Sequence, residues 1–312
     1  MTARRAAAVS TGQPGPTGGA VRLRVGYAQA TVTQGALFAA VDEGFFARSG
    51  LDVSIQAVGG PAQVPALLAG EVQFAGMGAN EVANADVGGA SLAMIATAVD
   101  YPLFSLYADK KYKSVQDLAG QTIGITAAGA STDAAAHLFL RHFGLDGKVK
   151  VSPAGGTQTS ILAAMGKGIV AGGILAPPST AKAAQQGFVE LINGVQLGVP
   201  MNTTGIVATR AYLKAQPDVV RRFLKAYLEA WTFCADPANE QAVVQTLAKY
   251  TKSDSQDALV GYKEMLRVWR GAKAPTVNPA AVADILELST NPKVRAANSL
   301  QFIDNSVLQS VE

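Results

Sequence analysis

Short apolar strand segments alternate with helical segments along this chain, and the alternation begins again near residue 103. The first strand segment, residues 21–27 (VRLRVGY), alternates apolar and basic side chains, which is typical of a strand with one buried face. Further strands are predicted at residues 51–58, 72–78 and 91–99, separated by helical segments at residues 35–44, 62–71 and 79–89. This short spacing predicts a doubly wound α/β unit with a largely parallel sheet.

Two residues mark where these early helices begin or end. Gly70 is expected just beyond the end of the helix at residues 62–71, because glycine adopts the left-handed backbone that terminates helices. Asn80 stands at the start of the next helix, where its side chain is able to act as the cap.

A second unit of the same kind follows, and then a helical tail. Strands are predicted at residues 103–110, 121–126, 148–153 and 169–175, with helices at residues 114–120, 133–145, 157–168 and 179–187. The chain becomes extended again from Thr204 and is nearly all helical from Pro217. Crossovers near residues 100 and 206 would join lobe I (residues 22–102 plus 207–312) to lobe II (residues 103–206). Ligands bind such α/β sheets in the cleft at the carboxyl ends of the strands.

Length and composition agree with two globular lobes. A chain of 312 residues with 49% hydrophobic and 16% charged residues can fill two cores. The net charge of +3, without a basic block, does not indicate a nucleic-acid surface. Since the sequence lacks a run of about 18 apolar residues, no membrane-spanning helix is predicted. Residues 1–21 are interpreted as a disordered leader, because Arg4-Arg5 begins like an export signal but the apolar stretch after it is too short.

The cysteine and the histidines indicate neither a metal site nor a catalytic triad. Cys234 is the single cysteine and stands in a helical segment, where a buried apolar role is expected. His137 and His142 are the two histidines, and a spacing of five residues does not place them on one helix face.

Several longer segments carry a family resemblance. They are DEGFFARSGLDVSI at residues 42–55, ALLAGEVQFAGMG at 66–78, SVQDLAGQTIGI at 114–125, FLRHFGL at 139–145 and PDVVRRFLKAY at 217–227. In order and spacing they resemble the substrate-binding proteins of nitrate, sulfonate, taurine and thiamine-precursor importers. The resemblance covers roughly residues 22–250. Where that family usually has Asp after G-x-V in each lobe, this chain has Gln73 and Ala171.

The resemblance implies a type II periplasmic binding protein: two doubly wound lobes, a hinge, a cleft between the lobes and a helical C-terminal tail. Such a protein captures a small organic solute, here a sulfonate, carboxylate or related molecule, by hinge closure. It delivers the solute to an ABC permease and its ATPase and meets the membrane only through the permease. The expected location is the periplasm or another extracytoplasmic site, the expected state is a monomer, and neither catalysis nor a cofactor is expected.

The resemblance also places the ligand loops. The residues carried over as ligand-binding are Gln29, Thr31, Thr33, Gly59, Gly60, Pro61, Ala79, Asn80, Asp100, Tyr101, Gly129, Ala130, Ser131, Thr132, Asp133, Gly156, Thr157 and Pro177.

Each of these signals has an ordinary structural interpretation as well. Small residues at 127–133 favour an anion at a helix N-terminus, but Ser, Thr and Asp are also the commonest helix caps. The turn Gly59-Gly60-Pro61 would end a strand in any protein, and Tyr101 would serve equally as a core tyrosine.

None of these loops contains Lys or Arg, whereas Glu81, Asp100 and Asp133 lie in or beside them. An anion would therefore rely on backbone amides, hydroxyls and helix dipoles. A neutral or cationic heterocycle, such as a thiamine-pyrimidine precursor, is the alternative solute.

Two other protein classes have a similar fold. A thiamine-pyrimidine synthase-like enzyme would use an active-site His and a Lys that bears pyridoxal phosphate, but the predicted loops contain neither residue type. A LysR-type effector domain would carry an N-terminal helix-turn-helix, for which residues 1–21 are too short and too rich in Gly and Pro.

Overall fold

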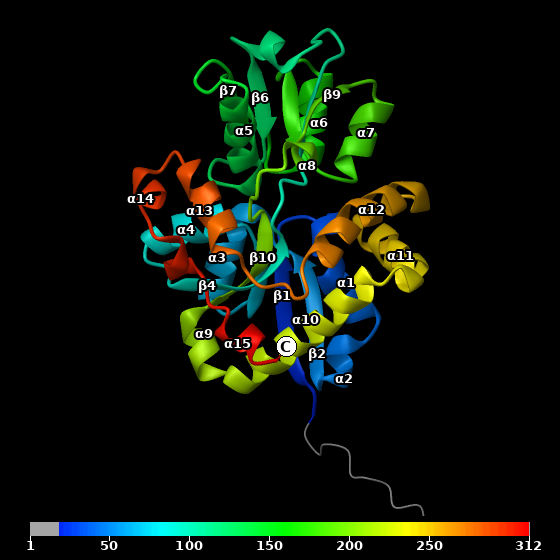
Figure 1. Cartoon of the computed structure of the whole chain (residues 1–312), viewed down its shortest axis with the longest axis vertical. Helices are drawn as coiled ribbons and strands as arrows, with labels where there is room; N and C mark the ends of the chain where they lie inside the picture. The colour runs from blue at the N-terminus through cyan, green and yellow to red at the C-terminus, as the bar shows by residue number, and fades with distance from the viewer. Residues whose placement is uncertain (1–18, 312) are drawn as a thin grey trace, which may run out of the picture.

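The computed structural model describes residues 19–311, apart from the side chain of Pro61. The predicted leader therefore lies outside the described residues for positions 1–18, and Val21, its last residue, already belongs to the first strand. The described chain forms two α/β lobes, one above the other in Figure 1, and the C-terminal helices all lie with the lower lobe.

Lobe I is built on a five-stranded sheet with the order β2-β1-β3-β10-β4. Its strands are β1 (Val21–Tyr27), β2 (Leu51–Ala57), β3 (Phe74–Met77), β4 (Leu92–Val99) and β10 (Thr204–Thr209). The helices between the first four strands are α1 (Gly35–Asp42), α2 (Phe45–Arg48), α3 (Gly60–Leu68) and α4 (Ala79–Val87), and a 3-10 turn, η1 (Val32–Gln34), precedes α1. Every residue of β4 is buried, in agreement with its sequence, which is apolar except for Thr97.

Lobe II repeats this plan with the sheet order β7-β6-β8-β5-β9. Its strands are β5 (Ser105–Ala108), β6 (Thr122–Ile125), β7 (Lys150–Pro153), β8 (Gly172–Leu175) and β9 (Val189–Asn193). Its helices are η2 (Val115–Leu118), α5 (Ser131–His142), α6 (Gln158–Gly166), α7 (Ser179–Gln185) and α8 (Gly194–Leu197).

Each sheet is mixed but largely parallel, as predicted, because one strand in each runs opposite to the other four. β10 runs antiparallel to β3 and β4 in lobe I, and β5 runs antiparallel to β8 and β9 in lobe II. Both of these strands directly follow a crossover, so each arrives from the other lobe and enters its sheet in the opposite direction. The remaining pairings, β1 with β2 and β3, and β6 with β7 and β8, are parallel as predicted.

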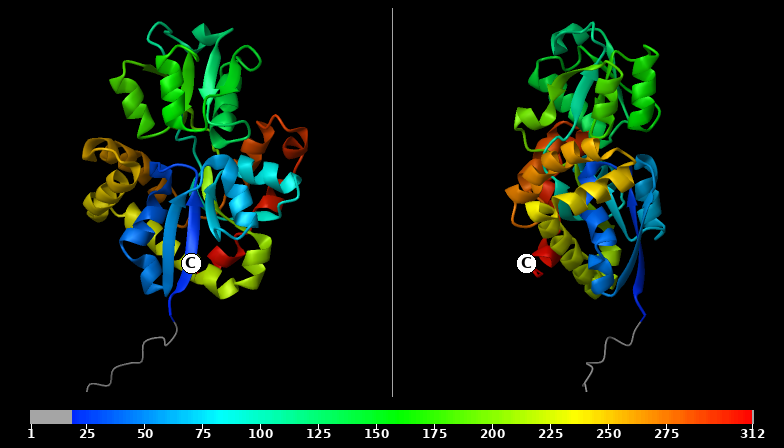
Figure 2. Two further views of the ribbon diagram at one scale, coloured as in Figure 1. Left: turned by 180° about the vertical axis from the view of Figure 1, so that it is seen from behind. Right: turned by 90° about the vertical axis from the view of Figure 1, so that its right-hand side faces the viewer.

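The tail consists of α9 (Arg210–Ala215), α10 (Pro217–Ala235), η3 (Pro237–Asn239), α11 (Glu240–Thr251), α12 (Ser255–Gly271), α13 (Pro279–Glu287), α14 (Pro292–Arg295), η4 (Ser299–Phe302) and α15 (Ser306–Gln309). Pro217 begins α10 as predicted. The ring of Phe223 on α10 stacks on Phe46 at 4.8 Å and on Phe74 at 4.0 Å between centroids, which packs the tail into the core of lobe I. α11 and α12 lie on one flank of the lobe and α13 and α14 on the other (Figures 1 and 2).

Two chain segments connect the lobes, residues 100–104 and residues 198–203. They are hydrogen-bonded to each other: Met201 N donates to Asp100 O at 2.7 Å, and Thr203 Oγ1 donates to Tyr101 O at 3.2 Å. Asn202 Nδ2 also donates to Asp100 Oδ1 at 2.8 Å. The crossovers therefore form one paired strap at the centre of the molecule.

The predicted helix boundaries are mostly close to the observed ones. Gly70 has φ +71° and follows α3, as expected of a residue just past a helix end. Asn80, however, is not the cap of α4: Gly78 holds that position, and the carboxylate of Glu81 accepts from its N–H at 2.8 Å. Within residues 19–311, none of the helices has both the length and the apolar character needed to cross a membrane.

Candidate functional site

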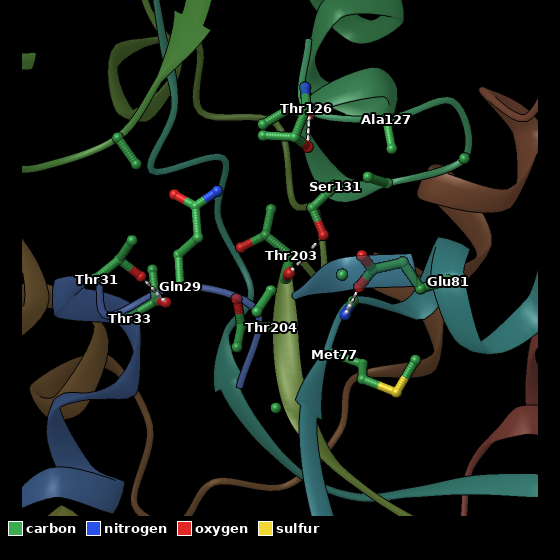
Figure 3. A pocket seen from close by; sticks show the side chains of 18 of the residues that line it. Gln29, Thr31, Thr33, Met77, Glu81, Thr126, Ala127, Ser131, Thr203 and Thr204 are labelled. Atoms are coloured by element: carbon green, nitrogen blue, oxygen red, sulfur yellow. Dashed lines mark hydrogen bonds between the residues drawn. The ribbon is translucent and has the colours of Figure 1, made fainter. Parts of the chain in front are cut away.

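A cavity of about 590 Å³ lies between the lobes, at the carboxyl ends of strands from both sheets. Its wall includes the loop after β1, the junction of β3 and α4, the loop before α5 and the second crossover. Figure 3 shows side chains from both lobes pointing into this space. The lining residues that carry polar side chains are Gln29, Thr31, Thr33, Gln34, Glu81, Asn84, Thr126, Ser131, Thr132, Gln158, Thr203, Thr204 and Thr290.

The loop after β1 supplies one wall of hydroxyl and amide groups. Thr31 Oγ1 and Thr33 Oγ1 are hydrogen-bonded at 2.8 Å, and the side chain of Gln29 extends from the same loop toward lobe II (Figure 3). Gln34 is 4% exposed, and its Oε1 has no hydrogen-bond partner among the described residues. A buried amide oxygen without a donor is costly, so this wall has an acceptor to offer to a bound molecule.

Among the described residues of the lining, Glu81 alone carries a charged side chain. It stands in the first turn of α4, where the Gly78 N–H donates to its Oε2 at 2.8 Å. Burial raises the pKa of Glu81 to about 7, and the hydrogen bond from Gly78 opposes this rise only in part. The carboxylate faces a cavity whose described lining contains no Lys, Arg or His.

The opposite wall comes from the turn between β6 and α5. Thr132 Oγ1 accepts from Thr126 N at 3.0 Å and is hydrogen-bonded to Thr126 Oγ1 at 2.7 Å. Gly129 has φ +76°, a conformation that favours glycine, and its N–H donates to Asp133 Oδ2 at 2.7 Å. These bonds fix the small-residue turn so that the N-terminus of α5 faces the cavity.

Three hydrogen bonds cross the cavity region from one lobe, or its strap, to the other. Asn80 Nδ2 donates to Gly129 O at 2.8 Å, and Ser131 Oγ donates to Thr203 O at 2.9 Å (Figure 3). Gln158 N donates to Gln29 Oε1 at 3.5 Å. Gly78 lies at this contact, where an added Cβ would overlap the Ser131 hydroxyl and the Thr203 carbonyl. The lobes are therefore in contact along one side of the cavity.

The histidines and the cysteine are used elsewhere. His137 Nε2 lies 3.4 Å from Asp133 Oδ1, and its Nδ1 lies 3.5 Å from Asp146 Oδ1. The hydrogen bond to Asp133 is the main cause that raises the pKa of His137. Cys234 is buried in α10, as expected. Among residues 19–311, no group of three or more His, Cys, Asp or Glu side chains is arranged to hold a metal ion.

Comparison with known proteins places this geometry in a family. The family model described as NMT1/THI5 like matches residues 33–240, more than half of the chain. The chain belongs to the NMT1/THI5-like family. This confirms the resemblance found in the sequence. A comparison with curated protein sequences gave no match.

Solved structures similar to this NMT1/THI5-like protein include three binding proteins. The ligand-binding component of an ABC-type import system from Staphylococcus aureus, with zinc bound, has a TM-score of 0.77 and 14% identity, over 94% of this chain and 99% of that one. The periplasmic nitrate-binding protein NrtA from Synechocystis has a TM-score of 0.76 and 12% identity, over 94% of this chain and 88% of that one. The alkanesulfonate-binding protein SsuA from Xanthomonas axonopodis, bound to MOPS, has a TM-score of 0.69 and 19% identity, over 95% of this chain and 99% of that one. The likeness establishes the fold, which is the predicted type II periplasmic binding protein fold.

Half of the residues predicted for ligand binding line the cavity of this NMT1/THI5-like protein. They are Gln29, Thr31, Thr33, Gly60, Gly129, Ala130, Ser131, Thr132 and Gly156. Their convergence follows from the topology, because the loops that follow β1, β2, β6 and β7 meet at the same end of their sheets.

The other predicted residues are outside the described lining, and most have structural roles. Gly59 and Thr157 stand at the N-caps of α3 and α6, Ala79 is the buried first residue of α4, and Pro61 lies in the first turn of α3. Asn80 donates a hydrogen bond to Gly129 O, and Asp133 accepts one from Gly129 N. Asp100 accepts a hydrogen bond from the side chain of Asn202.

Tyr101 and Pro177 have different surroundings from those expected. Tyr101 is 43% exposed on the first crossover, so its interpretation as a core tyrosine is wrong. Pro177 lines a second, smaller cavity between α7, β5, β9 and α12.

Several lining residues were not predicted. Thr203 and Thr204 come from the second crossover and the start of β10, Phe104 from the first crossover, and Gln158 from the first turn of α6. The adjacent hydroxyls of Thr203 and Thr204, at the point where the chain passes between the lobes, could have indicated these two lining residues from the sequence. Phe104 and Gln158 carried none, because only the antiparallel entry of β5 and the packing of α6 turn them toward the cavity.

Proposed function

We propose that this protein is the solute-binding component of an ABC import system. The proposal rests on its membership of the NMT1/THI5-like family, on the fold that it shares with binding components of import systems, and on the cavity between its lobes. In this role it works outside the cytoplasm as a monomer, passes its solute to a membrane permease driven by an ATPase, and changes no bond in the solute.

The observation that selects the solute is the isolated carboxylate of Glu81. The lining contains many hydroxyl and amide groups, one carboxylate and, among the described residues, no basic side chain. A cavity of about 590 Å³ accommodates a small organic molecule. We therefore propose a neutral or cationic heterocycle that bears an amino group, which donates to Glu81 while hydroxyls and amides meet its other polar atoms.

The apolar part of the lining supports a ring-shaped solute. Val64, Met77 and Phe104 line the cavity together with several alanines. Met77 and Glu81 both line the cavity, so we propose that a ring packs on Met77 with its amino group directed to the carboxylate (Figure 3). Aromatic and thioether groups bind a flat heterocycle through dispersion and burial of apolar surface.

An anionic solute is the second candidate, and one observation favours it. The N-termini of α4, α5 and α6 all border the cavity, through Gly78, Ser131 and Gln158. Helix N-termini carry partial positive charge and free N–H groups. A sulfonate or carboxylate would meet these groups and would be repelled by ionised Glu81.

Binding as a function of pH distinguishes the two classes. Thermal shifts would be recorded at pH 6 and pH 8 for two panels, aminated pyrimidines and amines on one side and sulfonates and carboxylates on the other. Because the pKa of Glu81 is about 7, a cationic or donor solute should bind more tightly at pH 8, when the carboxylate is ionised. An anion should bind more tightly at pH 6. A solute present at 100 times its Kd stabilises the folded state by about 2.7 kcal/mol.

The variant Glu81→Gln supplies the matched test. It should weaken binding of an amine-bearing solute at least tenfold and leave or improve the binding of an anion. If an anion gives the larger shift and Glu81→Gln strengthens it, the amine-bearing class is wrong and the second candidate stands. If no member of either panel shifts the melting temperature, the solute-binding proposal fails.

As part of the proposal we keep the predicted division into lobe I (residues 22–102 plus 207–312) and lobe II (residues 103–206), except that residues 198–203 count as a connecting strap and β10, from Thr204, belongs to the lobe I sheet. The paired crossovers at residues 100–104 and 198–203 are the segments about which the lobes would rotate. Rotation would open the cavity for entry of the solute, and the hydrogen bonds made by Asn80, Ser131 and Gln158 across the cavity region would close it.

A further inference from the structure

A second cavity, of about 240 Å³, lies on the other side of the crossovers from the solute cavity. Its walls come from β5, β9 and the loop before α7 in lobe II, and from α12 in lobe I. In Figures 1 and 2 α12 lies directly below α7, so this crevice is also between the lobes. It shares no lining residue with the solute cavity.

The lining of the crevice is acidic on both sides. Asp257, Val260 and Glu264 are spaced three and four residues apart on α12, which places them on one helix face toward the crevice. Glu190 on β9 faces them from lobe II. No described Lys, Arg or His lines the crevice, and none of the described cations forms an ion pair with these three carboxylates.

Two largely buried residues also line the crevice and carry hydroxyl groups. Ser105 and Tyr107 alternate along β5, so both lie on the face that lines it, and they are 6% and 9% exposed. Neither hydroxyl makes a hydrogen bond to a described side chain or backbone group. They pair across the strands with Asn193 and Glu190 on β9. Because neither hydroxyl has a partner among the described residues and both open onto the crevice, both are free to bond a molecule held beside the three carboxylates.

We propose that this crevice is a second binding site, which takes a small organic cation carrying ammonium groups. An ammonium group donates three hydrogen bonds and would satisfy carboxylates and hydroxyls together. The carboxylates surround a cavity, and no three acidic side chains of the described chain gather closely enough to hold one metal ion. A flexible diamine fits this spread of charge better than a bare ion does. By bridging Glu190 and Glu264, it would hold the two lobes together.

The electrostatics of the free crevice agree with this proposal. Burial and the neighbouring Glu190 raise the pKa of Glu264 to about 7, and Arg267 on α12 only partly offsets them. Burial and Asp254 raise the pKa of Asp257, with Lys182 on α7 acting in the opposite direction. Burial, Glu190 and Glu264 raise the pKa of Tyr107 to about 12. A bound cation would favour the ionised carboxylates and release protons as it binds.

The test is a calorimetric titration of the full chain with 1,4-diaminobutane at pH 8, with 1,4-butanediol as the uncharged match. Glu190→Gln and Glu264→Gln should each weaken binding of the diamine at least tenfold, whereas Glu229→Gln, an exposed position on α10, should not. The diol should not bind, and the diamine should bind more weakly at pH 6. Both crevice variants should also melt at a higher temperature than the wild type without diamine, because each removes the like-charge repulsion between exposed Glu190 and partly buried Glu264. This readout shows that they fold.

The proposal is overturned if millimolar diamine does not bind, or if the diol binds equally well. It is also overturned if calcium binds with the same dependence on Glu190 and Glu264 while the diamine does not, since the ligand would then be a metal ion. The variant Glu81→Gln separates the two cavities: loss of diamine binding in this variant alone would assign the diamine to the solute cavity and refute the second site.

Discussion

Glu81 occupies a position where an ionised carboxylate is poorly supported. One backbone N–H from Gly78 reaches it at 2.8 Å, and the described cavity wall has no basic group to balance its charge. The folded state therefore holds a proton on Glu81 more tightly than the unfolded chain does, with a pKa of about 7 against 4.5. An ionised Glu81 therefore lowers the stability of the solute-free protein, and a bound hydrogen-bond donor would offset this loss.

The variant Glu81→Gln makes this cost measurable. Between pH 4.5 and 7 the folded protein binds more protons at Glu81 than the unfolded chain, so the contribution of Glu81 to stability falls as pH rises through that range. The melting temperature of Glu81→Gln relative to wild type should therefore rise from pH 4.5 to 7 and stay constant above it. Differential scanning fluorimetry without solute measures it, with the exposed Glu71→Gln as control. A difference that does not change with pH would contradict this account of Glu81.

Gln73 shows how a departure from the family pattern is accommodated. Its Oε1 accepts from Arg24 N at 2.8 Å, and its Nε2 donates to Gly70 O at 3.0 Å. An aspartate could accept the first bond but could not donate the second. The amide therefore ties β1 to the turn after α3 without adding a charge near the base of the lobe.

At the scale of elements, the two crossovers act as a single unit because Asp100 joins them. Its Oδ1 accepts from Thr97 Oγ1 at 2.7 Å and from Asn202 Nδ2 at 2.8 Å. Burial raises the pKa of Asp100, and these two hydrogen bonds oppose the rise. The predicted ligand-binding role for Asp100 is thus replaced by a structural one that keeps the strap intact.

Two substitutions at this position should have different effects on stability. Asp100→Ala removes the acceptor of the Thr97 hydroxyl and one of the two acceptors of the buried Asn202 amide, and should lower the free energy of unfolding by about 1–3 kcal/mol. Asp100→Asn keeps an acceptor oxygen in place and removes a partly buried charge, so its effect should be much smaller. Urea denaturation followed by circular dichroism measures both. Equal losses for the two variants would show that the charge, and not the hydrogen bonds, holds the crossovers together.

At the scale of the whole molecule, the interlobe hydrogen bonds of Asn80 and Ser131 bias the protein toward contact between the lobes. Each such bond contributes about 0.5–1.5 kcal/mol. The double variant Asn80→Ala, Ser131→Ala should therefore shift the balance toward an open form by roughly 5- to 150-fold.

Small-angle scattering of the solute-free protein measures this shift as a larger radius of gyration in the double variant. The matched control is Asn239→Ala, since the Asn239 amide donates to Phe233 O within lobe I at 3.0 Å. An unchanged radius of gyration in the double variant would mean that these two bonds do not set the distance between the lobes.

The sequence by itself determined the order of the elements, the repeat of two α/β units, the helical tail and the family. These features depend on local patterns, such as the alternation in residues 21–27, the largely apolar sequence of β4 and the positions of Gly70 and Pro217. It also placed the loops that border the cavity, because strand ends in such units converge whatever their side chains are.

Only the tertiary structure decided which side chains face the cavity and which hold the protein together. The antiparallel entry of β5 and β10 joins segments about 65 to 115 residues apart, and no local pattern encodes that pairing. Asn80, Asp100 and Asp133 resemble ligand groups in the sequence, yet each finds a partner within the protein. Glu81 accepts a hydrogen bond from one backbone N–H and is paired with no cation, because packing brings no described basic residue to its side of the cavity. The described site therefore presents an unpaired carboxylate.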